Sequence, residues 1–193
     1  MVKIGVLGLQ GAVQPHLEKL ISLGVTPQVV LSSRDLKDLA GIILPGGEST
    51  TQIQLLEKSD LWNLLADFIQ KKPTWGVCAG SILLAKEVSF PQQKSFGAID
   101  ISMKRNAYGR QTESFITPLE GLTLQGEAFQ MEGVFIRAPL ITRWGAQVEV
   151  LASFRESPVF VREKNVLVTT FHPELSESTV LHESFLKLCQ TAN

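Results

Sequence analysis

The 193-residue sequence is poor in cysteine, has almost no net charge, and lacks long hydrophobic runs. Only Cys78 and Cys189 are present, which excludes a disulfide-stapled secreted domain. Eighteen basic and 19 acidic residues leave a net charge of −1, which argues against a nucleic-acid partner or an anionic membrane surface. No apolar run approaches the roughly 18 residues of a membrane helix, and the amino-terminal residues have no signal-peptide pattern. We therefore expect a cytoplasmic protein with reduced thiols.

Glycine and proline occur at an ordinary frequency, 15 and 9 residues, so collagen-like and low-complexity structures are excluded. The chain is 44% hydrophobic and 19% charged, a composition that excludes an intrinsically disordered protein. A chain of this length buries roughly 70% of its unfolded surface when it folds. We expect residues 1–193 to form a single domain.

The sequence also lacks the common metal and cofactor motifs. It has three histidines and no C-x-x-C pair, no H-E-x-x-H and no P-loop. Gly5, Gly8 and Gly11 have the spacing G-x-x-G-x-x-G, which differs from the dinucleotide-binding G-x-G-x-x-G. No acidic residue follows the next apolar segment, where such a site would need one to hold the ribose. We therefore expect neither a metal nor a cofactor.

Short apolar segments alternate with segments of helical periodicity in the first half of the chain. The patterns predict strands at 2–9, 26–31, 41–44 and 74–77, and helices at 13–21, from residue 49 or 50, at 61–69 and at 81–87. Ser49 or Thr50 is expected to cap the second helix and Asp60 the third. This alternation is typical of a parallel sheet with helices on both faces.

The second half consists mainly of short strand patterns joined by turns. Strands are predicted at 98–103, 113–117, 131–137, 147–154, 158–162 and 166–171, and a last helix at 178–188. The polar stretch 90–111 is the expected mobile loop. Together the two halves predict an α/β three-layer sandwich: a central, mostly parallel sheet, helices on both faces and an antiparallel extension in the second half.

Cys78 is the strongest candidate nucleophile. It lies in Gly76-Val77-Cys78-Ala79-Gly80, between an apolar strand and an apolar helix. This is the Gly-x-nucleophile-x-Gly elbow with Cys in place of Ser, and small neighbours are needed because the turn is sharp. The start of a helix favours a thiolate, and the turn directs the Ala79 amide at an oxyanion. A buried structural cysteine is the less favoured interpretation.

A cysteine nucleophile needs a base and an orienting group. His172 follows the apolar strand at 166–171 and therefore lies at a strand end, as Cys78 does. In an extended segment residues i and i+2 point the same way, so Glu174 can reach the far ring nitrogen of His172. His16 and His182 lie in predicted helices, where we expect surface or packing roles.

Three further segments carry polar groups near predicted strand ends. Residues 45–51, Pro-Gly-Gly-Glu-Ser-Thr-Thr, form a turn whose exposed amides suit an oxyanion or another anion. Arg105 lies in the polar loop, and Arg137 ends an apolar strand. Either arginine could hold a substrate carboxylate, although a solvated surface arginine is the more common situation.

The combination of a cysteine elbow, a Gly-Gly-Glu-Ser turn and a late His-Pro-Glu resembles the class I (triad) glutamine amidotransferases. More narrowly, the chain resembles the glutaminase subunits of the two-component pyridoxal 5′-phosphate synthases. The blocks that carry this resemblance follow one another over nearly the whole chain, at residues 8–13, 44–51, 78–80, 105–111, 135–139 and 171–175. The first, fourth and fifth of these blocks distinguish this family, because other glutamine amidotransferases do not usually carry them.

The resemblance implies a role for each matching residue. Cys78 would be the nucleophile, His172 the acid and base, and Glu174 its orienting group. The oxyanion hole would be formed by amides of Gly47 and Ala79. The glutamine pocket would consist of Gly47, Glu48, Ser49, Arg105, Ile136 and Arg137. The family hydrolyses L-glutamine and passes ammonia to a separate barrel-shaped synthase, its protein partner.

Two residues depart from the family pattern, and three other functions stay open. Val77 stands where the family usually has Thr, and Pro15 where an acidic residue is more usual. Pro15 falls in the first turn of its helix, where a missing amide costs little. The alternatives are a glutaminase that feeds another synthase, such as one for imidazole glycerol phosphate or anthranilate, a cysteine hydrolase or stress protein of similar fold, and a regulator with a vestigial site.

Overall fold

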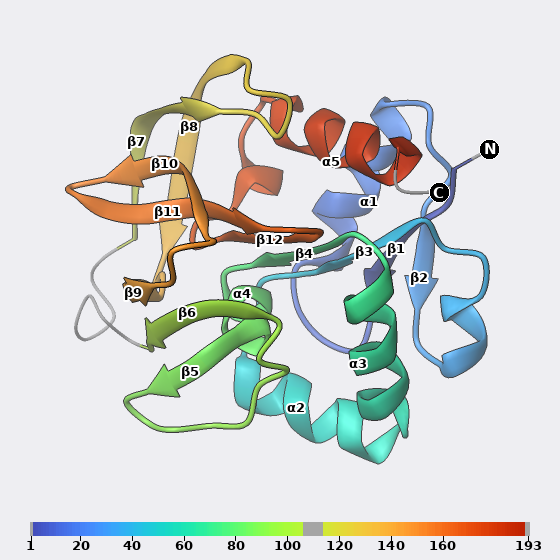
Figure 1. The fold of residues 1–193 in the computed structure, drawn as a ribbon. Coiled ribbons are helices and arrows are strands. Elements are labelled where there is room, and N and C mark those ends of the chain that lie inside the picture. The colour runs from blue at the N-terminus through green and yellow to red at the C-terminus, as the bar shows by residue number, and fades with distance from the viewer. Residues whose placement is uncertain (1, 106–113, 192–193) are drawn as a thin grey trace.

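The computed structural model describes residues 2–105 and 114–191 and contains a central sheet between two layers of helices (Figure 1). Five strands of this sheet run parallel in the order β2 (Gln28–Val30), β1 (Ile4–Leu7), β3 (Gly41–Leu44), β4 (Thr74–Val77) and β12 (Val166–Thr169). β1, β3, β4 and β12 are buried along their whole length, as their apolar sequences predict.

The antiparallel part continues the same sheet beyond β12. Its strands follow in the order β11 (Ser157–Glu163), β10 (Glu149–Phe154), β7 (Ser114–Leu122) and β8 (Ala128–Ile136). Within the described residues the central sheet thus has nine strands. Three more strands form a second, smaller sheet: β5 (Ala85–Ser89), β6 (Ile99–Lys104) and β9 (Leu140–Trp144).

Helices cover the parallel strands on both faces (Figure 1). α1 (Val13–Ser22) and α5 (Val180–Thr191) lie on one face, where Leu20 and Phe185 pack in a core that includes Trp75. α2 (Ser49–Lys58), α3 (Leu61–Lys71) and α4 (Ala79–Leu84) lie on the other, where Ile53 and Leu65 join a second core. Two short 3₁₀ helices, η1 (Ser33–Leu36) and η2 (Pro173–Leu175), complete the described elements. The predicted three-layer sandwich with an antiparallel extension is confirmed.

Two local predictions were wrong. The helix expected at 81–87 ends at Leu84, and Ala85 begins β5, which pairs with β6. Ala85 has an extended backbone, with a φ of −60° and a ψ of 149°, which ends the helix, and the pairing with β6 makes the following residues a strand. β9 was not predicted at all. The strand predicted at 98–103 is β6, so this part of the expected 90–111 loop is a strand. Residues 106–113 lie outside the described part of the chain.

The predicted cap of α2, Ser49 or Thr50, was wrong, whereas Asp60 does occupy the N-cap position of α3. Glu48 caps α2, because its carboxylate accepts hydrogen bonds from the Thr50 and Thr51 amides. Asp60, the N-cap residue of α3, has a left-handed backbone conformation, and its side chain makes no capping hydrogen bond. No helix in the described part of the chain is long and apolar enough to cross a membrane.

Candidate active site

The site lies beyond the carboxyl ends of four parallel strands. The segment after β1 contains Gln10 and Gly11, β3 leads to the 45–48 turn, β4 to Cys78, and β12 to His172. Carboxyl ends of parallel strands meet at one edge of a sheet, and ligands bind there in open α/β folds. The residues form a pocket of about 600 Å³. Its lining residues are Gln10, Gly11, Ala12, Gly46, Gly47, Glu48, Ser49, Cys78, Ala79, Ile82, Arg105, Ile136, Arg137, Pro139, His172 and Leu175.

Cys78 lies on a strained turn between β4 and α4. Its φ is 49° and its ψ is −103°, values that a residue with a side chain rarely adopts. The Cys78 amide donates a hydrogen bond to Thr169 O on β12, at 2.8 Å. A β-carbon at Gly80 would overlap Leu44 O, so only glycine permits the close approach of α4 to β3. This is the geometry of a nucleophile elbow.

His172 and Glu174 form a hydrogen-bonded pair behind the thiol. His172 follows β12 and is anchored by its amide, which donates to Val134 O at 2.8 Å. Its Nδ1 lies 2.7 Å from Glu174 Oε1, and both residues are buried. Glu174 lies in η2, behind the ring rather than in the pocket lining. The carboxylate therefore fixes the tautomer with hydrogen on Nδ1.

The electrostatics of His172 favour its protonated form. Burial alone lowers its pKa, but hydrogen bonds to Cys78 and Glu174 and the charges of those two groups outweigh burial and raise the pKa to about 10. An imidazolium beside a sulfur atom is the arrangement that activates cysteine nucleophiles. The remaining ring nitrogen, Nε2, is the one available to exchange a proton with a reacting group.

The 45–48 turn is held by the segment that follows β1. The Ala12 amide donates to Gly46 O at 2.8 Å, and the Gln52 side chain donates to Gln10 O and Pro45 O, both at 3.1 Å. The Glu48 amide donates to Gln10 Oε1 at 2.9 Å. Gln10 is thus a site residue whose role the sequence patterns do not predict. The only available signal was its position in the 8–13 block.

Glu48 is oriented by its capping role. Its carboxylate accepts from the amides and hydroxyls of Thr50 and Thr51, and Arg105 Nη2 lies 3.2 Å from Oε1. Burial alone raises the pKa of Glu48, but the hydrogen bonds from Thr50 and Thr51 outweigh burial and lower the pKa to about 2. Glu48 is therefore a fixed negative charge at the pocket, and Arg105 is committed to it.

Ile136 and Arg137 lie on the opposite wall of the pocket, at the end of β8. Ile136 O is 4.0 Å from Cys78 Sγ, and Arg137 has a φ of 44°. No carboxylate of the described residues pairs with Arg137, so it is the cation of the pocket still able to accept an anion. Ser49 lies deeper and donates through its hydroxyl to Gln93 Oε1 at 3.0 Å.

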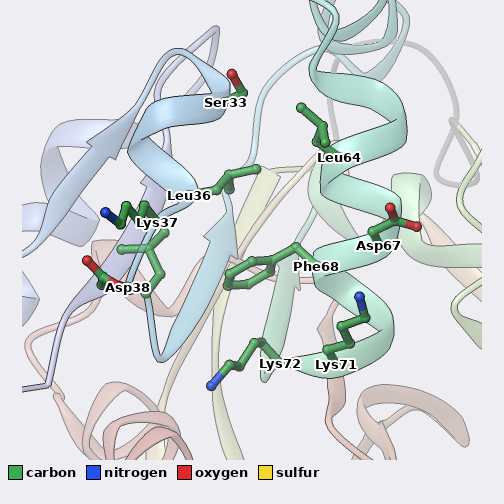
Figure 2. Close-up of a pocket in the computed structure, with 10 residues that line it drawn as sticks. Ser33, Leu36, Lys37, Asp38, Leu64, Asp67, Phe68, Lys71 and Lys72 are labelled. Atoms are coloured by element: carbon green, nitrogen blue, oxygen red, sulfur yellow. The ribbon is translucent and has the colours of Figure 1, made fainter.

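A second, larger hollow of about 710 Å³ lies between η1 and α3 (Figure 2). Phe68 and Leu36 point into it, and Lys37, Lys71 and Lys72 lie around it. No cysteine or histidine is among the residues that line this hollow. We therefore take the pocket at Cys78 as the candidate active site, although it is smaller. Nowhere in residues 2–105 and 114–191 do three His, Cys, Asp or Glu side chains gather as metal ligands would.

Comparisons with known proteins agree with this architecture. The model of the SNO glutamine amidotransferase family matches residues 6–191. Proteins named pyridoxal 5′-phosphate synthase subunit PdxT are similar: that of Kosmotoga olearia is 44% identical over 188 residues, covering 96% of this chain and 97% of the relative. That of Thermosipho africanus is 46% identical over 189 residues, covering 97% and 98%.

Solved structures show the same relationship. A crystal structure described as a glutamine amidotransferase has a TM-score of 0.88 and 41% identity, covering 97% of this chain and 98% of its own. PurLQS from Thermotoga maritima has a TM-score of 0.69 at 16% identity, covering 96% and 98%, which shows a shared fold. Because the family model spans nearly the whole sequence, the chain belongs to the SNO glutamine amidotransferase family, a family of enzymes.

Proposed function

We propose that the protein hydrolyses L-glutamine to L-glutamate and ammonia through Cys78, His172 and Glu174. The observation that carries this proposal is the buried His172–Glu174 pair, 2.7 Å apart, beside a cysteine on a strained elbow. Family membership supports the reaction class, that of the glutamine amidotransferases, and the relatives' names support the pathway of pyridoxal 5′-phosphate synthesis. The catalytic roles rest on the geometry and on the resemblance of the sequence blocks.

In the proposed reaction, the Cys78 thiolate attacks the side-chain amide carbon of glutamine. The amide oxygen becomes an oxyanion, which the Gly47 and Ala79 amides stabilise; one such donor contributes about 3 kcal/mol. Protonated His172 gives its proton to the leaving nitrogen, the C–N bond breaks, and ammonia and a glutamyl thioester form. His172 then takes a proton from water, which attacks the thioester. Glutamate leaves, and the thiolate and the imidazolium are restored.

The charges of the pocket suit a free amino acid. Glu48, held ionised by its cap, offers a negative charge for the α-ammonium group of glutamine. Arg137 is the better candidate for the α-carboxylate, because the Arg105 guanidinium is already bound to Glu48 and Thr50. Gly47, Ser49 and Ile136 complete the proposed pocket around the side-chain amide. Arg105 then acts by holding Glu48 in place.

We further propose that the ammonia is delivered to the separate barrel subunit of a pyridoxal 5′-phosphate synthase, in the cytoplasm. The support is the printed name of relatives that align along nearly their full length. The free subunit should be almost idle, with the Gly46-Gly47 turn forming a working oxyanion hole only in the complex. This arrangement would prevent the waste of glutamine.

The deciding experiment measures glutamate release from L-glutamine with and without that barrel subunit. Turnover that rises strongly with the partner supports both the chemistry and the pathway. Turnover that does not change with the partner supports the chemistry and indicates that the protein serves another synthase. No turnover in either case, together with a Cys78 that resists a glutamine-like alkylating agent, favours a regulator with a vestigial site.

Cys78→Ala is the matched control for that experiment. The substitution removes the nucleophile and leaves the pocket charges in place, so hydrolysis should vanish while glutamine still binds. Binding can be followed by calorimetry in the complex. Residual turnover near that of the wild type would remove Cys78 from the mechanism.

A further inference from the structure

Two buried histidines lie directly behind the candidate triad. His16 on α1 and His182 on α5 are both 0% exposed, and His16 Nδ1 is 3.0 Å from His182 Nε2. On its other side, His16 Nε2 faces Glu174 Oε2 at 3.6 Å. A continuous line of side chains therefore runs from α5 through α1 to Glu174 and His172. Their positions in the sequence predict only surface or packing roles for these two histidines.

The geometry sets the tautomer of both rings. A nitrogen lone pair directed at a carboxylate oxygen would be repelled, so His16 carries its hydrogen on Nε2. His16 Nδ1 is then an acceptor, and the hydrogen bond comes from His182 Nε2–H. Both rings are neutral: burial, followed by the charges of His182 and His172, lowers the pKa of His16, and burial lowers the pKa of His182 to about 3.

Glu174 has one carboxylate oxygen that lacks a hydrogen-bond donor in the described part of the chain. His172 Nδ1 binds Oε1, whereas Oε2 is buried and has no hydrogen-bond partner among the described residues. His16 Nε2 is likewise buried without a partner, and the two atoms face each other. A buried carboxylate oxygen without a donor is costly, and catalytic hydrogen bonds in unliganded enzymes are often long and shorten in the working complex.

We propose that His16 is a positioning residue for the active site: its Nε2–H is directed at Glu174 Oε2 and keeps Oε1 on His172. His182 acts one step further away by holding the His16 ring in the required tautomer. Trp75 helps to hold both rings in place, because it packs edge-to-face with each of them. Its ring centre lies 6.0 Å from that of His16 and 4.9 Å from that of His182. The other charged group near the pair is Lys19 on α1, which lowers the pKa of His182 and donates to the carbonyls of Ser176 and Glu177. This inference rests on the proposed glutaminase function.

The first test compares His16→Leu with His16→Gln in the complex with the synthase subunit. His16→Leu removes the donor and should lower kcat about tenfold, because a hydrogen bond to a charged group is lost. KM for glutamine should not change, because His16 does not line the pocket. His16→Gln supplies an amide donor and should recover most of kcat. Equal activity of all three proteins would overturn the proposal.

Leu20→Ala is the matched control for a simple loss of packing. Leu20 is one turn further along α1 and fully buried, and its apolar side chain can donate no hydrogen bond to Glu174. It should lower the melting temperature at least as much as His16→Leu does, and keep kcat. If Leu20→Ala lowers kcat equally, the effect of His16 is only structural.

The second test asks whether His16 acts through Glu174. In a Glu174→Ala background, His16→Leu should cause no further loss of kcat, because its target is gone. Multiplicative losses would overturn the proposal. If the wild type shows no turnover, the rate of Cys78 alkylation by iodoacetamide at pH 7 decides instead, with Cys78→Ala as the blank. His16→Leu should slow it and His16→Gln restore it; unchanged rates would overturn the inference, whatever becomes of the proposed function.

Discussion

Gly46 lies against the ring of His172. A β-carbon at residue 46 would overlap His172 Cε1 and come within 3.0 Å of Nδ1, and it would lie 3.4 Å from the Cys78 Cβ. The absence of a side chain at this position therefore lets the turn after β3 approach both the thiol and the imidazole. The proposed oxyanion hole requires this close approach.

Gly46→Ala should damage activity much more than stability. The added methyl group must displace the His172 ring, and a displacement of about 1 Å can cost roughly a hundredfold in rate. The measurement is kcat for glutamate release in the complex, with the melting temperature recorded alongside. Gly24→Ala is the control: its φ of 74° is unfavourable for alanine, but nothing lies within 4 Å, so it should lower stability and leave kcat intact. Wild-type kcat in Gly46→Ala would contradict the contact.

Glu174→Gln should lower the pKa of His172 well below 10, because the carboxylate stabilises the imidazolium by a hydrogen bond and by its charge. The midpoint can be followed by NMR of the His172 ring. We expect kcat of Glu174→Gln to remain about a hundredfold higher than that of His172→Asn. An unchanged midpoint would separate Glu174 from the triad.

Substitutions of Glu48 should separate capping from substrate binding. Glu48→Ala removes the cap of α2 and should cost about 1 kcal/mol of unfolding free energy. Glu48→Gln keeps an acceptor oxygen and should cost less, yet both should raise KM for glutamine, since both remove the charge. Asp60→Asn is the control, because the Asp60 side chain makes no capping hydrogen bond. Equal stability of Glu48→Ala and the wild type, measured by urea unfolding, would contradict the cap.

The buried histidines predict a loss of stability in mild acid. His182 has a pKa of about 3 in the folded protein and 6.5 when unfolded, and the pKa of His16 is lowered as well. Above pH 6.5 these rings are neutral in both states and add no pH dependence. Below pH 6.5 the unfolded chain binds protons that the folded protein does not. Each histidine then lowers the unfolding free energy by up to about 1.4 kcal/mol per pH unit.

Urea unfolding at pH 7.5, 6.5 and 5.5 measures this dependence. His172 acts in the opposite direction above pH 6.5: its pKa is about 10 when folded and 6.5 when unfolded, so its stabilising effect grows as the pH falls from 7.5 to 6.5. The acid slope of the buried pair is therefore taken between pH 6.5 and 5.5, where His172 adds less because the unfolded chain is increasingly protonated there as well. The stabilising effect of His172 is complete below pH 6.5 and is lost as the pH rises toward 10. His182→Phe should show roughly half the acid slope of the wild type. An equal slope in both proteins would show that His182 is not the source.

Local patterns were sufficient where one segment carries the whole signal. The buried strands β1, β3, β4 and β12 are apolar throughout, and Gly76-Val77-Cys78-Ala79-Gly80 specifies its own turn. Local patterns failed where pairing with a neighbouring strand decides whether a segment becomes a strand. Residues 85–88 form a strand because β6 lies beside them, and β9 exists because β6 offers its other edge.

The sequence of this chain determined the buried parallel strands, the helices between them and the strand ends that carry the candidate nucleophile, base and carboxylate, because periodicity, glycine spacing and strand ends are local properties. The tertiary structure alone decided that Gln10 supports the 45–48 turn, and that His16 and His182 meet behind Glu174. These contacts join residues distant in the chain, 166 positions apart for the two histidines. Their distances depend on how the layers pack, which no short segment encodes.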